Sequence, residues 1–383
     1  MKKIGLVSEY FYPHLGGITE HVYYYAKELI ARGFDVTILT GYAGEAAPDF
    51  LPPALKIIRM GRSVPIFSNA SFAKVTLAWN LGEKIKRVIK AEQFDLIHIH
   101  APAVPVLPAL FQKYADTVTI GTFHTYFDWS FYYALLKKTM QPYLDHLDGM
   151  VAVSPPCLDA LQRYFRIPAG HRIIPNGIDI EWFATPSGKH GSDDDGVPTI
   201  LFLGRLDPRN GLDLLLAAFP QVLKTIPQAR LLVVGDGPLR LMYERKAGAL
   251  LNQSIFFEGQ VNEGRPDYFA KSDVFCYPAM KASFGITLLE AMAAGTPIVA
   301  TDNVGFRYLV RHGHNGMLVE AGNAPALAAT LTQVLCDKAL ASTLRENGRH
   351  EVKAFAWSRV TDQLLAYYND VFLEKKGVPF AAC

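Results

Sequence analysis

The sequence is poor in cysteine and has no long apolar run. Its 383 residues include only four cysteines, which lie far apart and form no C-x-x-C pair, so neither a disulfide framework nor a zinc site is expected. No stretch approaches the length of a transmembrane helix. The segment from Met1 to Glu9 reaches a carboxylate after a short apolar run, which predicts a first strand rather than a signal peptide. A cytoplasmic protein with reduced thiols is the simplest interpretation.

The charges are few and nearly balanced. A formal net charge of +2 argues against a dedicated nucleic-acid-binding protein, because such proteins carry a concentrated basic surface. Half of the residues are hydrophobic, which is enough to build large cores, and a chain of this length is expected to form two domains. The oligomeric state is not indicated by any feature of the sequence.

Short apolar strands alternate with helical segments along the chain, which predicts an α/β fold with doubly wound parallel sheets. The strands expected in the first half are residues 4–8, 36–39, 57–58, 96–99, 118–120 and 150–153, with helices at 18–31, 72–91, 106–114 and 129–147. The strands expected in the second half are residues 199–203, 230–234, 255–257, 274–277 and 298–301. The polar stretch 186–196 is the expected linker between a first domain, residues 1–182, and a second domain, residues 197–357.

Ligands of such sheets bind beyond the carboxyl ends of the strands, and the first domain places two kinds of candidate there. Gly16 and Gly17 follow the first strand and can present backbone N–H groups to a phosphate or a sugar, although a turn that needs positive φ is another reason for two glycines. His124 follows the strand 118–120 and is either structural or functional. His98 and His100 face the same side of one strand, but no carboxylate or cysteine at ligand spacing lies nearby, so we predict no metal site.

The stretch from Ser283 to Pro297 is the most informative one in the chain. It predicts a loop formed by Ser283, Phe284 and Gly285, followed by a buried helix and a turn. Gly285 allows a ligand to approach backbone N–H groups at the start of the helix. Glu290 is a carboxylate in an otherwise apolar helix. It is either a structural or partly exposed residue, for example in an ion pair, or an acceptor for a ribose hydroxyl.

A second segment suited to binding an anion runs from Gly204 to Gly211. Arg205 stands at the end of a strand, where its guanidinium can bind a diphosphate through two hydrogen bonds. The alternative is a surface ion pair with Asp207. Arg209 is a further basic residue close by in the sequence.

These segments resemble the retaining glycosyltransferases of family 4, which have the GT-B fold of two Rossmann-like domains facing across a cleft. The loop at 283–285, Glu290 and the Ala-Met-Ala-Ala-Gly-Thr-Pro run after it match the donor-site pattern of that family. The first half is similar specifically to the phosphatidylinositol mannosyltransferases, and the matching pieces are Pro13–Val22, Gly61–Ile66, Phe94–His100, Gly121–Thr125 and Ile174–Asp179. The resemblance covers nearly the whole chain. It implies that the first domain binds the acceptor, that the second binds the nucleotide sugar, and that residues 358–383 cross back onto the first domain.

The resemblance implies a hexosyltransferase that retains anomeric configuration. Such an enzyme moves mannose or glucose from a nucleotide diphosphate sugar, such as GDP-mannose or a UDP-sugar, to a lipid or saccharide acceptor, for example a phosphatidylinositol-like lipid. It needs no cofactor, no metal and no nucleic-acid partner. The implied catalytic residues are His124, Arg205 and Glu290, and the implied donor-binding residues are Gly16, Gly17, Arg205, Arg209, Ser283, Phe284, Gly285 and Glu290.

Two positions depart from the family pattern. The family has a Glu at position 282 and a Lys at position 210, whereas this chain has Ala282 and Asn210. The enzyme therefore has a rearranged donor site, or uses another donor, or is a non-catalytic nucleotide- or lipid-binding protein with a decayed donor site on a GT-B scaffold. We favour catalysis because the other site residues are present.

Two stretches of the first domain are candidates for contact with an anionic membrane. Residues 81–90 form a basic amphipathic helix end, and residues 126–138 combine aromatic side chains with a Lys pair, a composition that suits a lipid interface. The alternatives are a solvated helix face for the first and a core helix for the second. With the resemblance to enzymes that glycosylate lipids, these stretches suggest a peripheral location on the inner face of the membrane.

Overall fold

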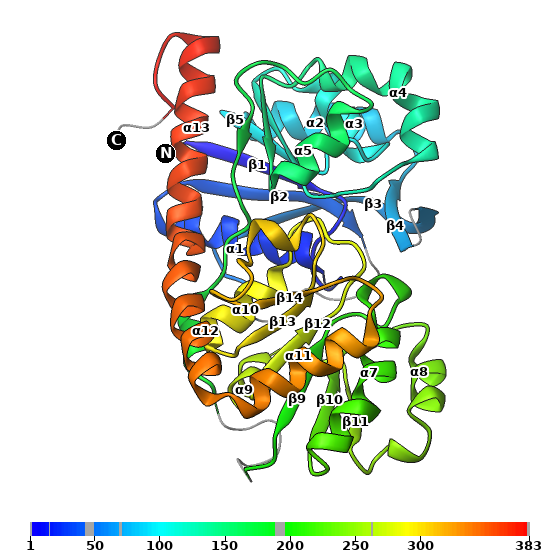
Figure 1. Ribbon diagram of the computed structural model, residues 1–383. Helices are drawn as coiled ribbons and strands as arrows, with labels where there is room; N and C mark the ends of the chain where they lie inside the picture. Colours follow the sequence, from blue (N-terminus) through cyan, green and yellow to red (C-terminus); the bar gives the residue numbers. More distant parts are fainter. Residues whose placement is uncertain are drawn as a thin grey trace. The chain divides into compact units, whose positions relative to one another are not determined.

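The computed structural model describes residues 2–14, 16–42, 50–68, 71–187, 196–261 and 263–380 (Figure 1), and it gives only the backbone of residues 65–68 and 71–74. The chain divides into two compact units. The first comprises Met1–Gly177 with Trp357–Cys383, and the second comprises Ile178–Ala356. The expected linker, residues 186–196, lies mostly outside the described residues. No described helix combines the length and apolar character that a bilayer crossing requires.

The first unit is built on an eight-stranded sheet with the order β4-β3-β2-β1-β5-β6-β7-β8. All neighbouring strands are parallel except β3 and β4. The strands are β1 (Lys3–Ser8), β2 (Asp35–Tyr42), β3 (Lys56–Ser68), β4 (Ser71–Leu77), β5 (Leu96–His100), β6 (Val118–Phe123), β7 (Gly149–Ala152) and β8 (Arg172–Ile173). The carboxyl ends of β1, β5, β6 and β7 therefore lie along one edge of the sheet, where ligands of such folds bind.

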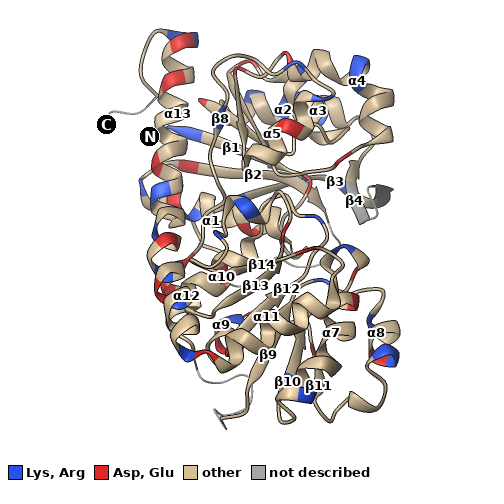
Figure 2. Cartoon of the chain, viewed as in Figure 1, with Lys and Arg blue, Asp and Glu red and all other residues tan. Residues whose placement is uncertain are grey.

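Helices cover both faces of this sheet, as the apolar strands require. They are α1 (Gly17–Ala31), α2 (Leu81–Glu92), α3 (Leu107–Tyr114), α4 (Phe131–Leu144), α5 (Pro155–Gln162) and α13 (Trp357–Lys376). One core packs α1 and α13 against the sheet, and a second core packs α2 and α3 against its other face. The Tyr367 hydroxyl on α13 accepts a hydrogen bond from the Met150 N–H at 2.9 Å. Basic and acidic residues are interspersed along α13 (Figure 2).

The helix expected over residues 72–91 is wrong in its first half. Residues 71–77 form β4, an antiparallel edge strand paired with β3, and α2 begins only at Leu81. Asn80, at the helix N-cap, has φ 54°, which separates the two elements. The β-branched pair Val75 and Thr76 favours the strand, and both side chains are buried.

The second unit has a six-stranded, fully parallel sheet with the order β11-β10-β9-β12-β13-β14. Its strands are β9 (Thr199–Leu203), β10 (Arg230–Val234), β11 (Ile255–Gly259), β12 (Val274–Tyr277), β13 (Ile298–Thr301) and β14 (Met317–Val319). Its α-helices are α6 (Ile180–Ala184), α7 (Leu212–Thr225), α8 (Arg240–Ala247), α9 (Arg265–Ala270), α10 (Ile286–Ala294), α11 (Ala324–Cys336) and α12 (Lys338–Glu351), and the 3₁₀ turns are η1 (Pro208–Asn210), η2 (Gly248–Leu250), η3 (Phe306–Tyr308) and η4 (Val352–Phe355). The sheet core packs against α7 and α11. The sequence therefore predicted the parallel α/β architecture of both units correctly.

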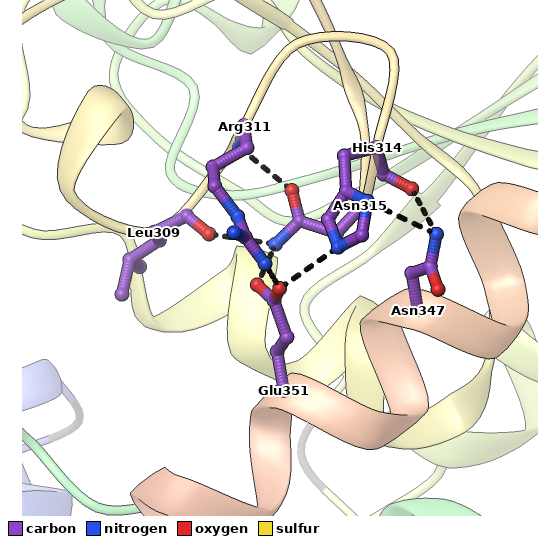
Figure 3. A network of polar contacts seen from close by, with 6 residues as sticks. All are labelled: Leu309, Arg311, His314, Asn315, Asn347 and Glu351. Atoms are coloured by element: carbon purple, nitrogen blue, oxygen red, sulfur yellow. Dashed lines mark hydrogen bonds and ion pairs between the residues drawn. The ribbon is translucent and has the colours of Figure 1, made fainter.

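A polar network fastens the loop after η3 to the end of α12 (Figure 3). Asn315 is 1 % exposed and uses its amide nitrogen to bond the Leu309 carbonyl at 2.9 Å and Glu351 Oε2 at 2.6 Å. Its amide oxygen accepts from the Arg311 N–H at 2.7 Å. Glu351 also forms an ion pair with Arg311 and contacts His314 Nε2 at 3.1 Å. Because Phe306 of η3 lies against Gly285 at the start of α10, this network supports the backbone of that helix start.

Candidate functional site

The glycine pair in the first unit lies at the start of α1. Gly16 is the N-cap residue, with an extended backbone at φ 161°, and no described side chain caps the helix. A Cβ atom added to Gly16 would meet nothing within 4 Å. Neither Gly16 nor Gly17 has a left-handed conformation, so the alternative of a turn that needs positive φ is wrong. Among the described residues no side chain caps the N–H groups of the first helical turn, and an anion is the partner that a helix N-terminus favours.

The two histidines of β5 have different surroundings. Their rings stack at 4.4 Å between centroids, which confirms that they share one face of the strand. His98 is fully buried and bonds the Tyr368 hydroxyl at 2.5 Å and Thr122 Oγ1 at 2.6 Å. Burial lowers the pKa of His98 to about 3. Since both of its ring nitrogens are occupied, His98 is a structural residue, and His100 is the one that continues toward the sheet edge.

His124 lies just beyond β6 and is partly exposed. Its Nε2 atom is 3.1 Å from His100 Nδ1. His21 on α1, which sequence patterning did not single out, places its ring 4.7 Å from that of His124 and 5.2 Å from that of His100. Burial lowers the pKa of all three groups, to about 4 for His21 and well below the ordinary value for the other two. The cluster is therefore uncharged at neutral pH.

Glu9 is a second residue at this edge that the sequence did not mark as a candidate. It follows β1 directly and is 3 % exposed. Its carboxylate accepts from Thr76 Oγ1 at 2.5 Å and from the Leu107 N–H at 3.2 Å. Burial raises the pKa of Glu9 to about 7, against the opposing effect of these hydrogen bonds. The edge of the first sheet thus combines a carboxyl group of raised pKa with a neutral imidazole cluster.

In the second unit, Arg205 lies beyond the end of β9 and is exposed. Asp207 does not pair with it. Instead Asp207 accepts from the Arg209 backbone at 3.1 Å and lies 3.5 Å from the Arg209 guanidinium. Among the described residues no side chain bonds the Arg205 guanidinium, so the alternative of an Arg205–Asp207 ion pair is wrong. Asn210, which stands in place of the family Lys, donates from Nδ2 to the Arg205 carbonyl at 2.7 Å and closes the turn.

The start of α10 has backbone N–H groups that no described side chain caps. Gly285 is the N-cap residue with φ 112°, and no described side chain caps this helix. Phe284 is 3 % exposed and packs against Tyr308, so its side chain supports the loop while Ser283 beside it is half-buried. Thr287, in the first turn, has a buried hydroxyl without a hydrogen-bond partner among the described residues. This hydroxyl is therefore a further candidate for contact with a bound molecule. The sequence analysis did not name it, because a single Thr in an apolar helix carries no functional signal.

Glu290 is 1 % exposed and holds an ion pair with Arg265, at 2.6 Å between Oε1 and Nη1. The guanidinium carbon of Arg265 lies 5.1 Å from the ring centroid of Trp182, which fixes the arginine in place. The structure thus contains the ion pair that sequence reasoning offered as one interpretation of Glu290. A role toward ribose remains a prediction. Arg265 lies 25 residues before Glu290, a spacing that no helix or strand period brings together, so the sequence gave no signal of the pair.

The comparisons with known proteins bear on the chain as a whole. Residues 15–182 match the model of Glycosyltransferase Family 4, and residues 188–351 match that of Glycosyl transferases group 1. The phosphatidyl-myo-inositol mannosyltransferase of Mycobacterium leprae is 33% identical over 385 residues, which cover 99% of this chain and 100% of that protein. The protein of the same name from Mycolicibacterium smegmatis is 34% identical over 96% of this chain and 94% of its own length. Among solved structures, the sucrose-phosphate synthase of Thermosynechococcus elongatus superposes with a TM-score of 0.77 at 26% identity, covering 98% of this chain and 100% of that one.

Three findings lead to the same family. The two sheets are built mainly from parallel strands, each half of the chain matches a glycosyltransferase family model, and a mannosyltransferase is similar over the full length of the chain. The fold is GT-B, the activity is transfer of a sugar from a donor, and this chain belongs to the family 4 glycosyltransferases together with the phosphatidyl-myo-inositol mannosyltransferases.

Proposed function

We propose that this glycosyltransferase moves a hexosyl group, with mannose as the first candidate, from a nucleoside diphosphate sugar to a hydroxyl of a phosphatidylinositol-like lipid, with retention of anomeric configuration. The observation that carries the proposal is the whole-length similarity to enzymes named for mannosyl transfer to phosphatidyl-myo-inositol. The local geometry of each unit supports it, because each contains groups suited to a part of these substrates.

The donor phosphates are the part for which the second unit is best suited. The Arg205 guanidinium is exposed and has no described partner, and the start of α10 offers backbone N–H groups at Gly285 without a side-chain cap. The start of α1 in the first unit offers a similar set at Gly16 and Gly17. A diphosphate carries its charge on several oxygens, so an arginine fork and helix N-termini are the groups that bind it most strongly.

The chemistry needs no protein nucleophile. In the proposed step the bond from the anomeric carbon to the phosphate oxygen breaks, and a bond from the same carbon to the acceptor oxygen forms on the same face. The acceptor proton passes to the departing phosphate, and the products are the glycosylated acceptor and a nucleoside diphosphate. Stabilising the negative charge that develops on the leaving group is then the main task of the protein, and Arg205 with the N–H groups of α10 would do so.

The remaining candidates would position the sugar and the nucleoside. His124 is neutral because burial lowers its pKa, so it would hydrogen-bond a sugar hydroxyl rather than supply a positive charge. Glu290 would accept from a ribose hydroxyl while Arg265 holds Oε1 of the carboxylate in one orientation. Thr287 would add a hydroxyl near the start of α10.

The departures at 282 and 210 define the rival function, a nucleotide- or lipid-binding protein that does not catalyse transfer. Asn210 has a structural role in the turn at Arg205. Its side chain is thus fitted into the loop, which favours a reorganised donor site over a decayed one.

The experiment is a transfer assay with GDP-mannose or UDP-glucose and phosphatidylinositol vesicles, read by mass spectrometry of the lipid, beside calorimetric titration with GDP and UDP. We expect a hexosylated lipid and tight binding of one nucleotide. Nucleotide binding without any lipid product supports the rival function. The double substitution Ala282→Glu with Asn210→Lys distinguishes the causes: a large gain in transfer indicates a decayed donor site, and a loss indicates a reorganised one.

We also propose that α4 and the residues before it contact the membrane that holds the acceptor. The alternative of a core helix is wrong, because Leu144 is the one residue of α4 that is buried. Trp129, Phe131 and Leu135 are each about two-thirds exposed, and a Lys pair follows them in the helix. Exposed aromatics beside lysines suit the interface of an anionic bilayer. Sedimentation with phosphatidylglycerol vesicles at low salt tests this, with a Trp129→Ser, Phe131→Ser variant expected to bind less than the parent. Equal binding by both proteins would contradict the assignment.

A further inference from the structure

Three imidazoles from separate elements converge at the carboxyl edge of the first sheet. His21 comes from α1, His100 from the end of β5 and His124 from just beyond β6. One ring nitrogen from each lies within 4.8 Å of the others. Within this group, His100 Nδ1 and His124 Nε2 are 3.1 Å apart.

Several buried polar atoms in this cluster make no hydrogen bond of standard geometry within the described part of the chain. His21 is 2 % exposed, and neither of its ring nitrogens makes a hydrogen bond of standard geometry with a described residue. Asn176 is near enough to raise the pKa of His21 against the larger effect of burial, but its own Oδ1 atom is also buried without such a bond. His100 Nε2 is also buried without a hydrogen bond of standard geometry to a described residue, but the ring faces His124 through Nδ1, so Nε2 is not the atom that would bind a cation beside His124. Buried donors and acceptors are nearly always satisfied, so this concentration at one place points to a bound species that interacts with nitrogen ligands.

The chemistry of the cluster favours a transition-metal cation. Three imidazoles offer only nitrogen ligands, one from each within 4.8 Å of the others. Imidazole ligands suit zinc, copper and nickel, whereas magnesium and calcium prefer oxygen. Two nitrogens bound tetrahedrally at ~2.0–2.1 Å from one zinc ion lie about 3.3 Å apart, close to the 3.1 Å observed. The longer separations, up to 4.8 Å between nitrogens, would have to shorten when a cation binds.

We propose that His21, His100 and His124 form a site for a divalent transition-metal cation such as Zn²⁺, with three imidazole ligands and a fourth position open at the partly exposed side of His124. The sequence gave no reason to expect this site, because His21 and His124 are distant from His100 along the chain. His98 is not a ligand.

The surroundings of the cluster fit a metal site. Ligand histidines need neighbours that orient them. His98, held by its own hydrogen bonds to Tyr368 and Thr122, stacks on His100. Asn176 lies beside both His21 and His124, where its side-chain oxygen can accept from the outward N–H of a bound imidazole. Since the three ligands carry no charge, the open position would take an anion or a hydroxide.

One consequence rests on the proposed function. A cation bound at Nε2 of His124 removes that nitrogen from the transferred sugar, so Zn²⁺ is expected to inhibit transfer. Binding itself does not rest on the proposed function, and the two are tested separately.

The test uses untagged, full-length protein stripped with chelator and titrated with Zn²⁺ against a chromophoric competitor, together with Co²⁺ titration read in the visible spectrum. We expect one equivalent to bind and Co²⁺ to give the intense bands of tetrahedral coordination. His21→Asn and His124→Asn should each weaken Zn²⁺ binding at least about tenfold, because loss of a ligand costs no less than loss of a neighbour that orients one. The matched controls are His171→Asn, outside the cluster in the same unit, and Cys336→Ser, which removes an exposed thiol; both should bind as the parent does.

The outcomes separate the proposals. His124→Asn, at a partly exposed position beyond the strand, serves if His21→Asn does not fold by circular dichroism. Absence of stoichiometric binding, or binding lost only in Cys336→Ser, overturns the site and leaves ordered water as the partner of these atoms. If the protein binds Zn²⁺ but transfers no sugar when assayed free of zinc, the metal site is supported and the proposed function is contradicted. If the protein transfers sugar but binds no Zn²⁺, the proposed function is supported and the metal site is contradicted.

Discussion

Acid should destabilise the first unit selectively, because that unit buries neutral histidines. The pKa of His21 is about 4 in the folded chain and that of His98 is about 3, whereas an exposed histidine in the unfolded chain titrates near 6.5. Below that value the unfolded state binds protons that the folded state refuses. Stability is therefore complete above about pH 6.5 and falls as the pH decreases.

The magnitude follows from these pKa values. Between pH 7.5 and pH 5, His21 and His98 each remove about 2 kcal/mol from the free energy of unfolding. The pKa of His100 is shifted in the same direction by burial and adds to the loss. Glu9 opposes them, since its pKa of about 7 lets the folded state hold a proton that the unfolded state releases above about pH 4.5, which returns roughly 2 kcal/mol. The net loss is then at least about 2 kcal/mol, a large share of ordinary domain stability.

Two substitutions separate these contributions. His21→Asn should reduce the loss between pH 7.5 and pH 5 by about 2 kcal/mol, and Glu9→Gln should increase it by about 2 kcal/mol. Urea unfolding followed by tryptophan fluorescence in a Trp182→Phe background reports on the first unit, because the other three tryptophans lie there. If the two variants follow the same pH dependence as the parent, the buried neutral state of the cluster is wrong.

Further predictions concern the second unit. Arg205→Ala should weaken GDP or UDP binding by about 10- to 100-fold in calorimetry, since a charged hydrogen bond contributes about 1.5–3 kcal/mol, whereas Arg209→Ala, whose guanidinium already has a carboxylate neighbour, should weaken it less; equal effects would contradict the assignment. Gly211→Ala should lower the free energy of unfolding, measured in urea, by at least about 3 kcal/mol, because the added Cβ would meet a backbone carbonyl at 1.9 Å and the residue has φ 76°. Gly313→Ala, with φ 73° and nothing within 4 Å, should cost about 1 kcal/mol, and similar losses for both would show that the clash is relieved. Asn315→Asp should lower the free energy of unfolding by about 2–3 kcal/mol, because it removes the two hydrogen bonds that the amide nitrogen donates and places a second carboxylate in the network of Figure 3. An unchanged urea midpoint would show that the network contributes little.

The parallel strands of both sheets were predictable because apolar runs buried on two faces leave an unambiguous pattern. The helix expected over residues 72–91 failed because an edge strand and a helix follow one another with only a short break, and the left-handed Asn80 that separates them has no clear sequence signal. The side chain of Thr76 also bonds Glu9, a long-range contact that adds to its local preference for a strand and that the sequence does not show.

The candidate site was predictable where backbone chemistry determines it. Gly16 and Gly285 stand at the starts of α1 and α10, as their positions in the sequence indicated. Partners distant along the chain were not predictable: Arg265 beside Glu290, and His21 beside His124, are brought together only by packing. Arg205 and Asp207 are near in sequence, yet the turn directs the carboxylate to Arg209 instead.

The most direct test of the transfer mechanism is the configuration of the first product. Protein incubated with the donor it binds and with phosphatidylinositol would be followed by NMR of the anomeric proton, early enough to precede any further reaction. We predict a hexosyl lipid whose anomeric configuration equals that of the donor, formed together with one equivalent of nucleoside diphosphate. A product of inverted configuration, or release of free sugar without a lipid product, would contradict the same-face substitution proposed for this chain.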